Sequence, residues 1–140
     1  MPPAAADTAP SKAELSVLKQ LWRAGAQSAR QVQTAVGDGL GWSHSTTRTH
    51  LLRMIDKGLV AKDYAEGVTV YAARAEKVSI MSRMIRDFAD RVLELDEPLP
   101  STAFAQSRLF SEEEAEALGR LLAEAPDEVG DDDGVGEEGK

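Results

Sequence analysis

The stretch Gly41–Val60, GWSHSTTRTHLLRMIDKGLV, is the most informative part of the chain. A tryptophan and several hydroxyl residues open it, an apolar-periodic segment follows, and a Lys-Gly pair comes near its end. Ser43 or Ser45 is expected to cap a helix over residues 43–57, because serine side chains accept hydrogen bonds from the first free amides of a helix. Gly58 predicts the end of that helix, since glycine adopts the left-handed conformation without strain.

The predicted helix has two faces with different chemistry. With 3.6 residues per turn, one face is mostly apolar and is expected to meet the core. That face comprises Thr47, Leu51, Met54 and Ile55. The other face is polar and basic apart from one leucine, and it comprises His44, Ser45, Arg48, Thr49, Leu52 and Arg53. Thr46 lies at the boundary, near the helix start.

The outward face has the side chains with which proteins read the major groove of DNA. Hydroxyls and the N-terminal amides of a helix bind phosphate oxygens. Arginine bridges guanine O6 and N7, and a threonine methyl contacts the thymine methyl. Trp42 lies directly before the helix, where its ring is expected to pack under the turn and its indole N–H to reach a phosphate.

Each of these side chains also has an ordinary structural explanation. Ser and Thr at a helix start are most often caps, and exposed arginines are often simply solvated. Tryptophan is more often a core residue than a ligand contact. His44 and His50 are expected at the surface or its boundary, and metal binding by them is disfavoured. The joint pattern favours DNA contact more strongly than any one residue does.

Three helices and a hairpin are predicted around this stretch. Ser11 to Glu14 and Ser28 to Gln31 each match a capping box, which opens a helix. Residues 59–73 combine β-branched and aromatic side chains with an Ala-Glu-Gly turn, which indicates a β-hairpin. Three helices followed by a hairpin is the order of a winged helix-turn-helix.

A second helical region follows the hairpin. An apolar stripe from Ser79 predicts a helix that ends before Pro98, Ser101 opens a short helix, and Ser111 to Glu114 matches a third capping box. The region is too small to form a core alone, so a second copy of the chain, or else the N-terminal domain, is expected to cover its apolar stripes. The dimer is the favoured alternative. Its candidate residues are Ile80, Met84, Phe88, Val92, Leu95, Leu118, Leu121 and Leu122.

The predicted fold is mainly α with a small β-hairpin, a winged helix-turn-helix N-terminal domain followed by a C-terminal helical dimerisation region. The ends are Pro/Ala-rich and acidic, respectively, which is typical of disorder. The expected divisions are a disordered segment 1–10, a winged-helix DNA-binding domain 11–76, a helical dimerisation region 77–125 and a disordered acidic tail 126–140.

Charge is distributed unevenly along a chain whose net charge is −8. Residues 1–80 contain ten Lys/Arg and seven Asp/Glu, a net charge of +3, whereas residues 81–140 contain six and seventeen, a net charge of −11. A polyanion is therefore expected to meet the first half and to be repelled by the second.

Several classes of protein are disfavoured by composition. The chain has no cysteine, which excludes disulfides and thiolate metal sites. No catalytic constellation, phosphate loop or metal-ligand cluster is evident, so neither enzymatic activity nor a cofactor is expected. The sequence has no apolar run of membrane-spanning length and no secretory signal, so we expect a cytoplasmic protein without membrane insertion.

The segments LSVLKQLW, SARQV, GWSHSTTRTHLLRMIDKGLV and VYAA together resemble the penicillinase-repressor family of bacterial winged-helix regulators. The resemblance covers about residues 12–124. It implies a homodimer that binds a palindromic operator in double-stranded DNA and represses transcription. Carried over position by position, it implies DNA-facing roles for Trp42, Ser43, Thr46, Arg48, Thr49 and Arg53. His44, on the outward face of the predicted helix, completes the set of candidate DNA-binding residues.

The resemblance also implies a means of induction. Well-studied members are cleaved in their C-terminal region by a membrane-bound sensor protease, and their Asn-Phe scissile bond maps onto Ala103-Phe104, with alanine in place of asparagine. The wing has Gly67-Val68 where the family usually has Gly-Arg. Copper-responsive members use a cysteine pair that this chain lacks.

A protein-interaction adaptor that does not bind DNA is the alternative function.

Overall fold

The computed structural model describes residues 9–124, which divide into two compact units. The first unit ends at Lys77 and the second begins at Val78. The predictions of disorder for residues 1–10 and 126–140 concern segments of which only residues 9 and 10 are described.

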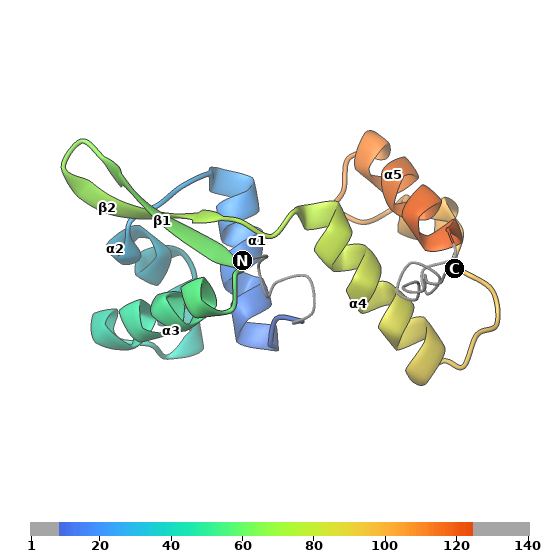
Figure 1. Cartoon of the computed structure of the whole chain (residues 1–140), viewed down its shortest axis with the longest axis horizontal. Helices are drawn as coiled ribbons and strands as arrows, with labels where there is room; N and C mark the ends of the chain where they lie inside the picture. Colours follow the sequence, from blue (N-terminus) through green and yellow to red (C-terminus); the bar gives the residue numbers. More distant parts are fainter. Residues whose placement is uncertain (1–8, 125–140) are drawn as a thin grey trace, which may run out of the picture. The chain divides into compact units, whose positions relative to one another are not determined.

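The first unit consists of three helical segments followed by an antiparallel hairpin (Figure 1). In order, its elements are α1 Lys12–Ala24, α2 Ala29–Val32, the π-turn η2 Gln33–Gly37, the 3₁₀ turn η3 Asp38–Leu40, α3 His44–Asp56, β1 Val60–Ala65 and β2 Val68–Ala73. α2 and α3 contact each other and lie below the hairpin in this view. This order confirms the predicted winged helix-turn-helix.

The starts of α1 and α2 are the predicted capping boxes. The Ser11 hydroxyl accepts a hydrogen bond from the Glu14 amide, and the Glu14 carboxylate accepts one from the Ser11 amide. Ser28 and Gln31 make the same reciprocal pair. Such caps satisfy helix amides that have no partner within the helix, each worth about 1 kcal/mol.

The hairpin is attached to the helices by backbone and side-chain bonds. The Gln27 amide donates to the Tyr71 carbonyl at 3.0 Å and the Tyr71 amide donates back at 2.7 Å, which adds a one-residue bridge beside β2. The Trp22 indole N–H donates to the Ala75 carbonyl at 3.0 Å. The core beneath is mostly aliphatic, and its fully or nearly fully buried members include Val17, Leu18, Leu21, Val32, Leu51, Met54, Leu59, Val60 and Tyr71.

The two strands pair in register from Val60 opposite Ala73 to Ala65 opposite Val68. Glu66 and Gly67 form the turn, both with positive φ, at 54° and 80°. Two consecutive positive φ angles are typical of the type I′ turn that matches strand twist. The hairpin thus projects as the wing.

The second unit consists of α4 Lys77–Arg91, the 3₁₀ turn η4 Ser101–Phe104 and α5 Glu112–Ala123. Its core is a cluster of Val78, Leu118 and Leu122, packed with Met81, Ile85, Phe104, Phe110, Ala117 and Leu121. The third capping box, between Ser111 and Glu114, is present. A small core of its own therefore exists in this region, contrary to the expectation that it cannot form one.

α4 ends at Arg91, although its predicted apolar stripe runs on to Leu95. Glu94 has a φ of 56°, and the Leu95 amide turns back to donate to the Ala89 carbonyl at 2.9 Å. The residues after Arg91 include Glu94, Asp96 and Glu97, and acidic side chains are unfavourable at the negative end of a helix. Periodicity alone could not show this local effect.

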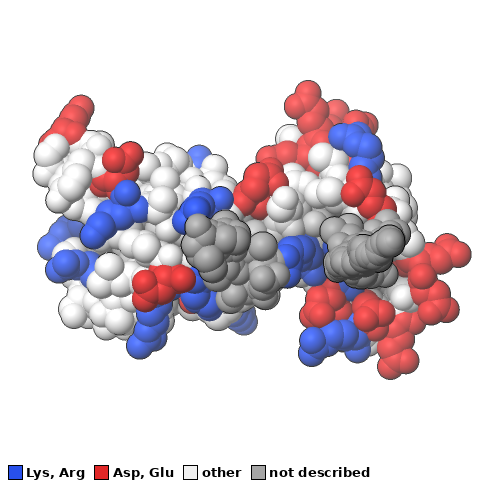
Figure 2. Space-filling model, viewed as in Figure 1, with Lys and Arg blue, Asp and Glu red and all other residues white. Residues whose placement is uncertain are grey.

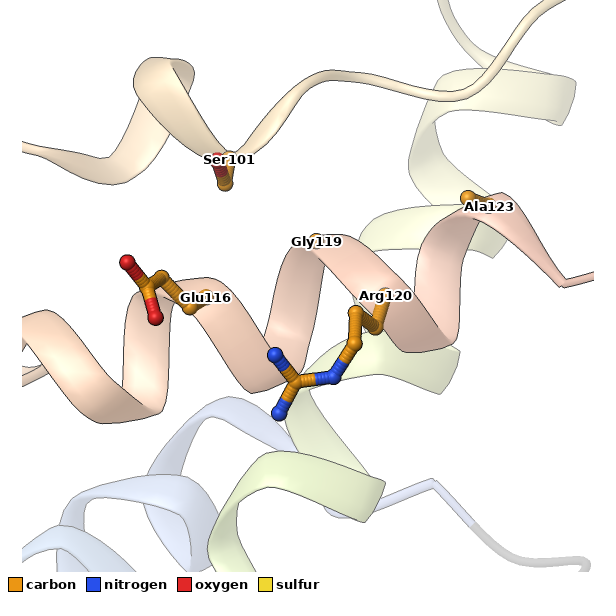
Figure 3. A pocket seen from close by; sticks show the side chains of 5 residues that line it. All are labelled: Ser101, Glu116, Gly119, Arg120 and Ala123. Atoms are coloured by element: carbon orange, nitrogen blue, oxygen red, sulfur yellow. The ribbon is translucent and has the colours of Figure 1, made fainter.

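η4 lies directly against α5 at Gly119 (Figure 3). A Cβ at Gly119 would be 2.6 Å from the Ser101 Cβ and 3.1 Å from its Cα, so only glycine allows this approach. Ser101, Glu116, Gly119, Arg120 and Ala123 line a shallow, open pocket around the contact. No helix within residues 9–124 is long and apolar enough to cross a membrane.

Candidate nucleic-acid interface

The start of α3 is built by hydroxyl hydrogen bonds. Ser43 is the N-cap, and its hydroxyl accepts from the Thr46 amide at 3.0 Å. The Thr47 hydroxyl donates to the Ser43 carbonyl at 2.9 Å. Of the two serines predicted as candidate caps, Ser43 has this role.

The inward face of α3 is the one that helical periodicity predicts. Thr47, Leu51 and Met54 are fully buried, and Ile55 is half-buried. Thr47 packs closely on Gly37, where an added Cβ would lie 2.9 Å from the Thr47 hydroxyl oxygen. The absence of a Cβ at Gly37 thus allows the preceding turn to approach α3 closely, and the Thr47 hydroxyl is satisfied within the helix.

All seven candidate DNA-binding residues remain accessible to solvent in the described chain. Ser43, Arg48, Thr49 and Arg53 are exposed. The half-buried members are Trp42, His44 and Thr46. The structure therefore brings two guanidinium groups and the exposed Thr49 onto one face of one helix.

Trp42 stacks on His50, an arrangement that sequence reasoning missed. The ring centroids are 4.0 Å apart and the planes differ by 5°. The Trp42 amide also donates to the Gly37 carbonyl at 2.8 Å. Trp42 therefore links the turn before α3 to His50, in the middle of that helix. The spacing of eight residues from Trp42 to His50, slightly over two turns, is the only signal in the sequence.

The hydroxyl hydrogen bonds decide which groups are left for phosphate. Thr49 donates to the Ser45 carbonyl at 3.1 Å, and Ser43 donates to the Thr46 hydroxyl oxygen at 3.1 Å. A phosphate oxygen only accepts hydrogen bonds, and each hydroxyl has one hydrogen. In this arrangement Thr46 keeps its hydroxyl hydrogen for an outside acceptor, whereas Ser43 and Thr49 use theirs internally.

The charge around this face is mixed but favours an anion. Figure 2 shows basic side chains on the visible face of the first unit, while acidic side chains predominate on the second. Lys57, at the end of α3, is paired with Glu14 at 2.7 Å. Burial alone would raise the pKa of Glu14, but the hydrogen bonds from Lys57 and Ser11 and the Lys57 charge together lower it. The pair leaves Arg48 and Arg53 as the principal exposed cations of α3.

The tip of the wing has little to offer a phosphate. Tyr64 is 74% exposed, Val68 is 51% exposed, and the acidic Asp63 and Glu66 flank them. Lys62 is the only basic residue of the hairpin strands. A wing contact to phosphate would therefore depend on Lys62 or on backbone amides.

The candidate dimerisation residues differ in how far the chain itself buries them. Ile80, Leu118 and Leu122 are buried within the chain itself, and Leu121 packs against the same core cluster. Leu118, Leu121 and Leu122 contribute to the unit's own core because α5 packs on α4, which the sequence prediction did not foresee. Ile80 is buried but does not belong to this core cluster. Met84 is half-buried. The exposed group is Phe88, Val92 and Leu95, joined by Leu93, which the apolar stripe did not identify.

The candidate cleavage segment is folded. Ala103 is exposed, but Phe104 is half-buried, contacts the core cluster and lies edge-on to Phe110 at 6.3 Å. Both belong to η4. No group of three or more potential metal-ligating side chains occurs among residues 9–124.

The sequence model of a family described as penicillinase repressor matches residues 10–124. The match spans both units and most of the chain, in agreement with the winged-helix fold and the accessible α3 face. A search of curated proteins finds no match. The chain belongs to the penicillinase-repressor family, a family of transcriptional repressors.

Proposed function

We propose that this chain is a homodimeric repressor that binds a palindromic operator through α3. The observation that carries the proposal is the two-sided character of this helix. Thr47, Leu51 and Met54 hold one side in the core, while Arg48 and Arg53 are exposed on the other. An exposed helix face with two arginines, on a winged-helix frame, has the size and chemistry of a major-groove reader.

The residues of α3 divide into two roles in this proposal. Arg48 and Arg53 donate to base edges, guanine O6 and N7 being the acceptors that suit a guanidinium. The Thr46 hydroxyl and the first amides of the helix bind a phosphate, which positions the helix without selecting sequence. Trp42 and His50 hold the helix start rigid.

Dimerisation is proposed through the exposed C-terminal end of α4 and the residues that follow it. Phe88 is 52% exposed and Val92 61% exposed, and Leu93 and Leu95 lie beside them in sequence. A cluster of four exposed apolar side chains in a short segment is typical of an interaction surface. A two-fold pair of such surfaces would set two α3 helices to read half-sites about one helical turn apart.

Relief of repression is proposed to follow cleavage at Ala103-Phe104 by a membrane sensor protease. Cutting there would separate α5 from α4 in the covalent chain, and the cluster of Val78, Leu118 and Leu122 would then be held by packing alone. Loss of that cluster would loosen α4, whose C-terminal end and following residues form the proposed dimer surface. Operator affinity would fall because each half-site alone binds weakly.

The adaptor alternative rests on a specific feature, the wing tip. Tyr64 and Val68 are exposed near the acidic Asp63 and Glu66, which is a surface suited to a basic, apolar protein partner rather than to DNA. In that case α3 would have no nucleic-acid role.

Selection from random duplex DNA tests the proposal against this alternative. We expect the full chain to enrich a palindrome, with binding that weakens steeply as salt rises, because phosphate contacts release counterions. Arg48→Ala in the same selection should relax the preference at one base pair per half-site. If the wild-type protein enriches no sequence at low salt, DNA binding through α3 is rejected and the adaptor function is favoured.

A further inference from the structure

Leu52 is an apolar side chain on the otherwise polar outward face of α3. It is 46% exposed. Arg48 precedes it by four residues, so the two side chains are neighbours on the helix surface. Arg53 follows it directly. The leucine therefore lies within the group of side chains that we propose to face DNA.

Thr49 adds a second apolar group next to Leu52. Its hydroxyl donates to the Ser45 carbonyl one turn earlier, at 3.1 Å, so the oxygen lies against the helix backbone. The methyl group is then the part of this exposed side chain left for a partner. Residues three apart on a helix are neighbours, so the Thr49 methyl and the Leu52 side chain form one small apolar surface.

We propose that this apolar surface reads the 5-methyl group of thymine. The thymine methyl is the apolar group that normal base pairs present in the major groove. The adjacent Arg48 and Arg53 would bind phosphates or guanines on either side, which fixes the leucine at one position of each half-site. This inference rests on the proposed function and deepens it, because it assigns a base to a residue outside the candidate DNA-binding set.

The obvious alternative is that Leu52 is a single exposed leucine of no consequence, which is common on protein surfaces. Two observations argue for a role. The leucine stands between two arginines rather than in a neutral surface, and the neighbouring threonine hydroxyl is turned inward and leaves a methyl beside it. A groove with negative walls and methyl groups on its floor suits such an arrangement.

The experiment uses deoxyuridine, which lacks only the 5-methyl group. A duplex selected by the wild-type chain is resynthesised with each thymine of the half-site replaced in turn by deoxyuridine. At one or two thymine positions, we expect each deoxyuridine substitution to weaken binding about three- to fivefold. This is the effect expected when the burial of one methyl group is lost. Substitution of the other thymines should leave binding unchanged.

Two variants assign the effect to residues. Leu52→Ala should bind the thymine duplex more weakly and should no longer distinguish thymine from deoxyuridine at that position. Thr49→Ser removes only the neighbouring methyl group, so it measures how much of the discrimination is due to that methyl. Alanine is a better helix former than leucine, so α3 should remain intact, which circular dichroism checks. Leu52→Met, which keeps an apolar side chain of similar size, should retain the discrimination.

The outcomes separate this inference from the function on which it rests. If the chain selects a duplex but deoxyuridine changes nothing, or if Leu52→Ala still discriminates as well as the wild type, the thymine assignment is wrong and operator binding stands. If the chain selects no duplex, both are wrong.

Discussion

The Lys57 ammonium lies 2.7 Å from the Glu14 carboxylate, and this ion pair joins the end of α3 to the first turn of α1. Glu14 is almost completely buried, and the same carboxylate accepts the Ser11 amide of the capping box. One side chain thus closes the start of α1 and fixes the end of the helix that we propose to read DNA.

The first prediction concerns the pH dependence of stability. The pKa of Glu14 is lower in the folded protein than its usual value of 4.5: burial raises it, and the bonds from Lys57 and Ser11 outweigh that effect. The stabilising contribution of the charged pair is therefore fully present above pH 4.5 and is lost as the pH falls through the lower folded pKa. We expect Glu14→Gln to lower the free energy of unfolding by roughly 1–3 kcal/mol near neutral pH.

Urea unfolding measured across the acidic range checks this prediction. The difference between wild type and Glu14→Gln should shrink as the pH drops below 4.5. Asp87→Asn is the matched control, because Asp87 pairs with Arg91 at 3.5 Å in an exposed position where an ion pair contributes little. A difference for Glu14→Gln that is the same at every pH would show that the charge is not the stabilising element.

The second prediction concerns the contact between Gly37 and Thr47. Gly37 has a helical φ of −63°, so alanine would be favoured there by propensity alone. Its added Cβ would nevertheless lie 2.9 Å from the Thr47 hydroxyl oxygen and 3.3 Å from the Gln33 Cγ. We expect Gly37→Ala to destabilise the first unit by about 1–3 kcal/mol, as overpacking does.

Thermal unfolding measures this effect, and two variants interpret it. Gly39→Ala adds the same methyl where no atom lies within 4 Å, so it should be neutral or slightly stabilising. Combining Gly37→Ala with Thr47→Ala removes the clashing oxygen and should recover part of the loss. Gly37→Ala as stable as the wild type would mean that this turn can move away from α3 at no cost.

The third prediction concerns Arg48. If it reads a guanine, Arg48→Ala should weaken operator binding by roughly 1–3 kcal/mol and broaden the preference at one base pair, while the remaining positions keep theirs. If it binds only a phosphate, affinity should fall equally for all sequences and the salt dependence should become shallower. Arg108→Ala, an exposed arginine of the second unit, makes the same change in net charge and should leave both unchanged.

The structure shows where sequence patterns are informative and where they are not. The three capping boxes and the two faces of α3 were predictable, because both depend on residues three or four apart within one segment. The Trp42–His50 stack was not, because it depends on how the Trp42 side chain turns at the helix start. The burial of Leu118 was not either, because it depends on which apolar stripe covers α5. A stripe on α5 looks the same whether α4 or a second chain covers it.

The division of the predicted dimer residues leads to the fourth prediction. Phe88 and Val92 are exposed, whereas Leu118 is fully buried in the second unit. The pair Phe88→Ser with Val92→Ser should therefore give a folded monomer in sedimentation equilibrium, with weak operator binding. Leu118→Ser should instead unfold the second unit, as burying an unpaired hydroxyl in place of an aliphatic side chain does. A double variant that remains dimeric would remove the end of α4 from the interface.

The fifth prediction concerns access to the proposed scissile bond. η4 packs on α5 through Gly119 and Ser101, and Phe104 anchors it to the core cluster, so Ala103-Phe104 cannot take the extended form that proteases bind unless η4 detaches. Gly119→Ala would bring a Cβ to 2.6 Å from the Ser101 Cβ and within 3.2 Å of its backbone nitrogen. We expect η4 to detach more often and a broad-specificity protease to cut near Phe104 several-fold faster, because proteolysis follows the population of the open form.

Mass spectrometry of fragments from timed digests measures that rate. Glu116→Ala changes another residue of the same pocket without any clash at Ser101, so it should be cut at the wild-type rate. Gly119→Ala should also retain its operator affinity before digestion and lose it in step with cleavage, since α3 belongs to the other unit. Equal rates for Gly119→Ala and wild type would show that packing of η4 on α5 does not protect this bond.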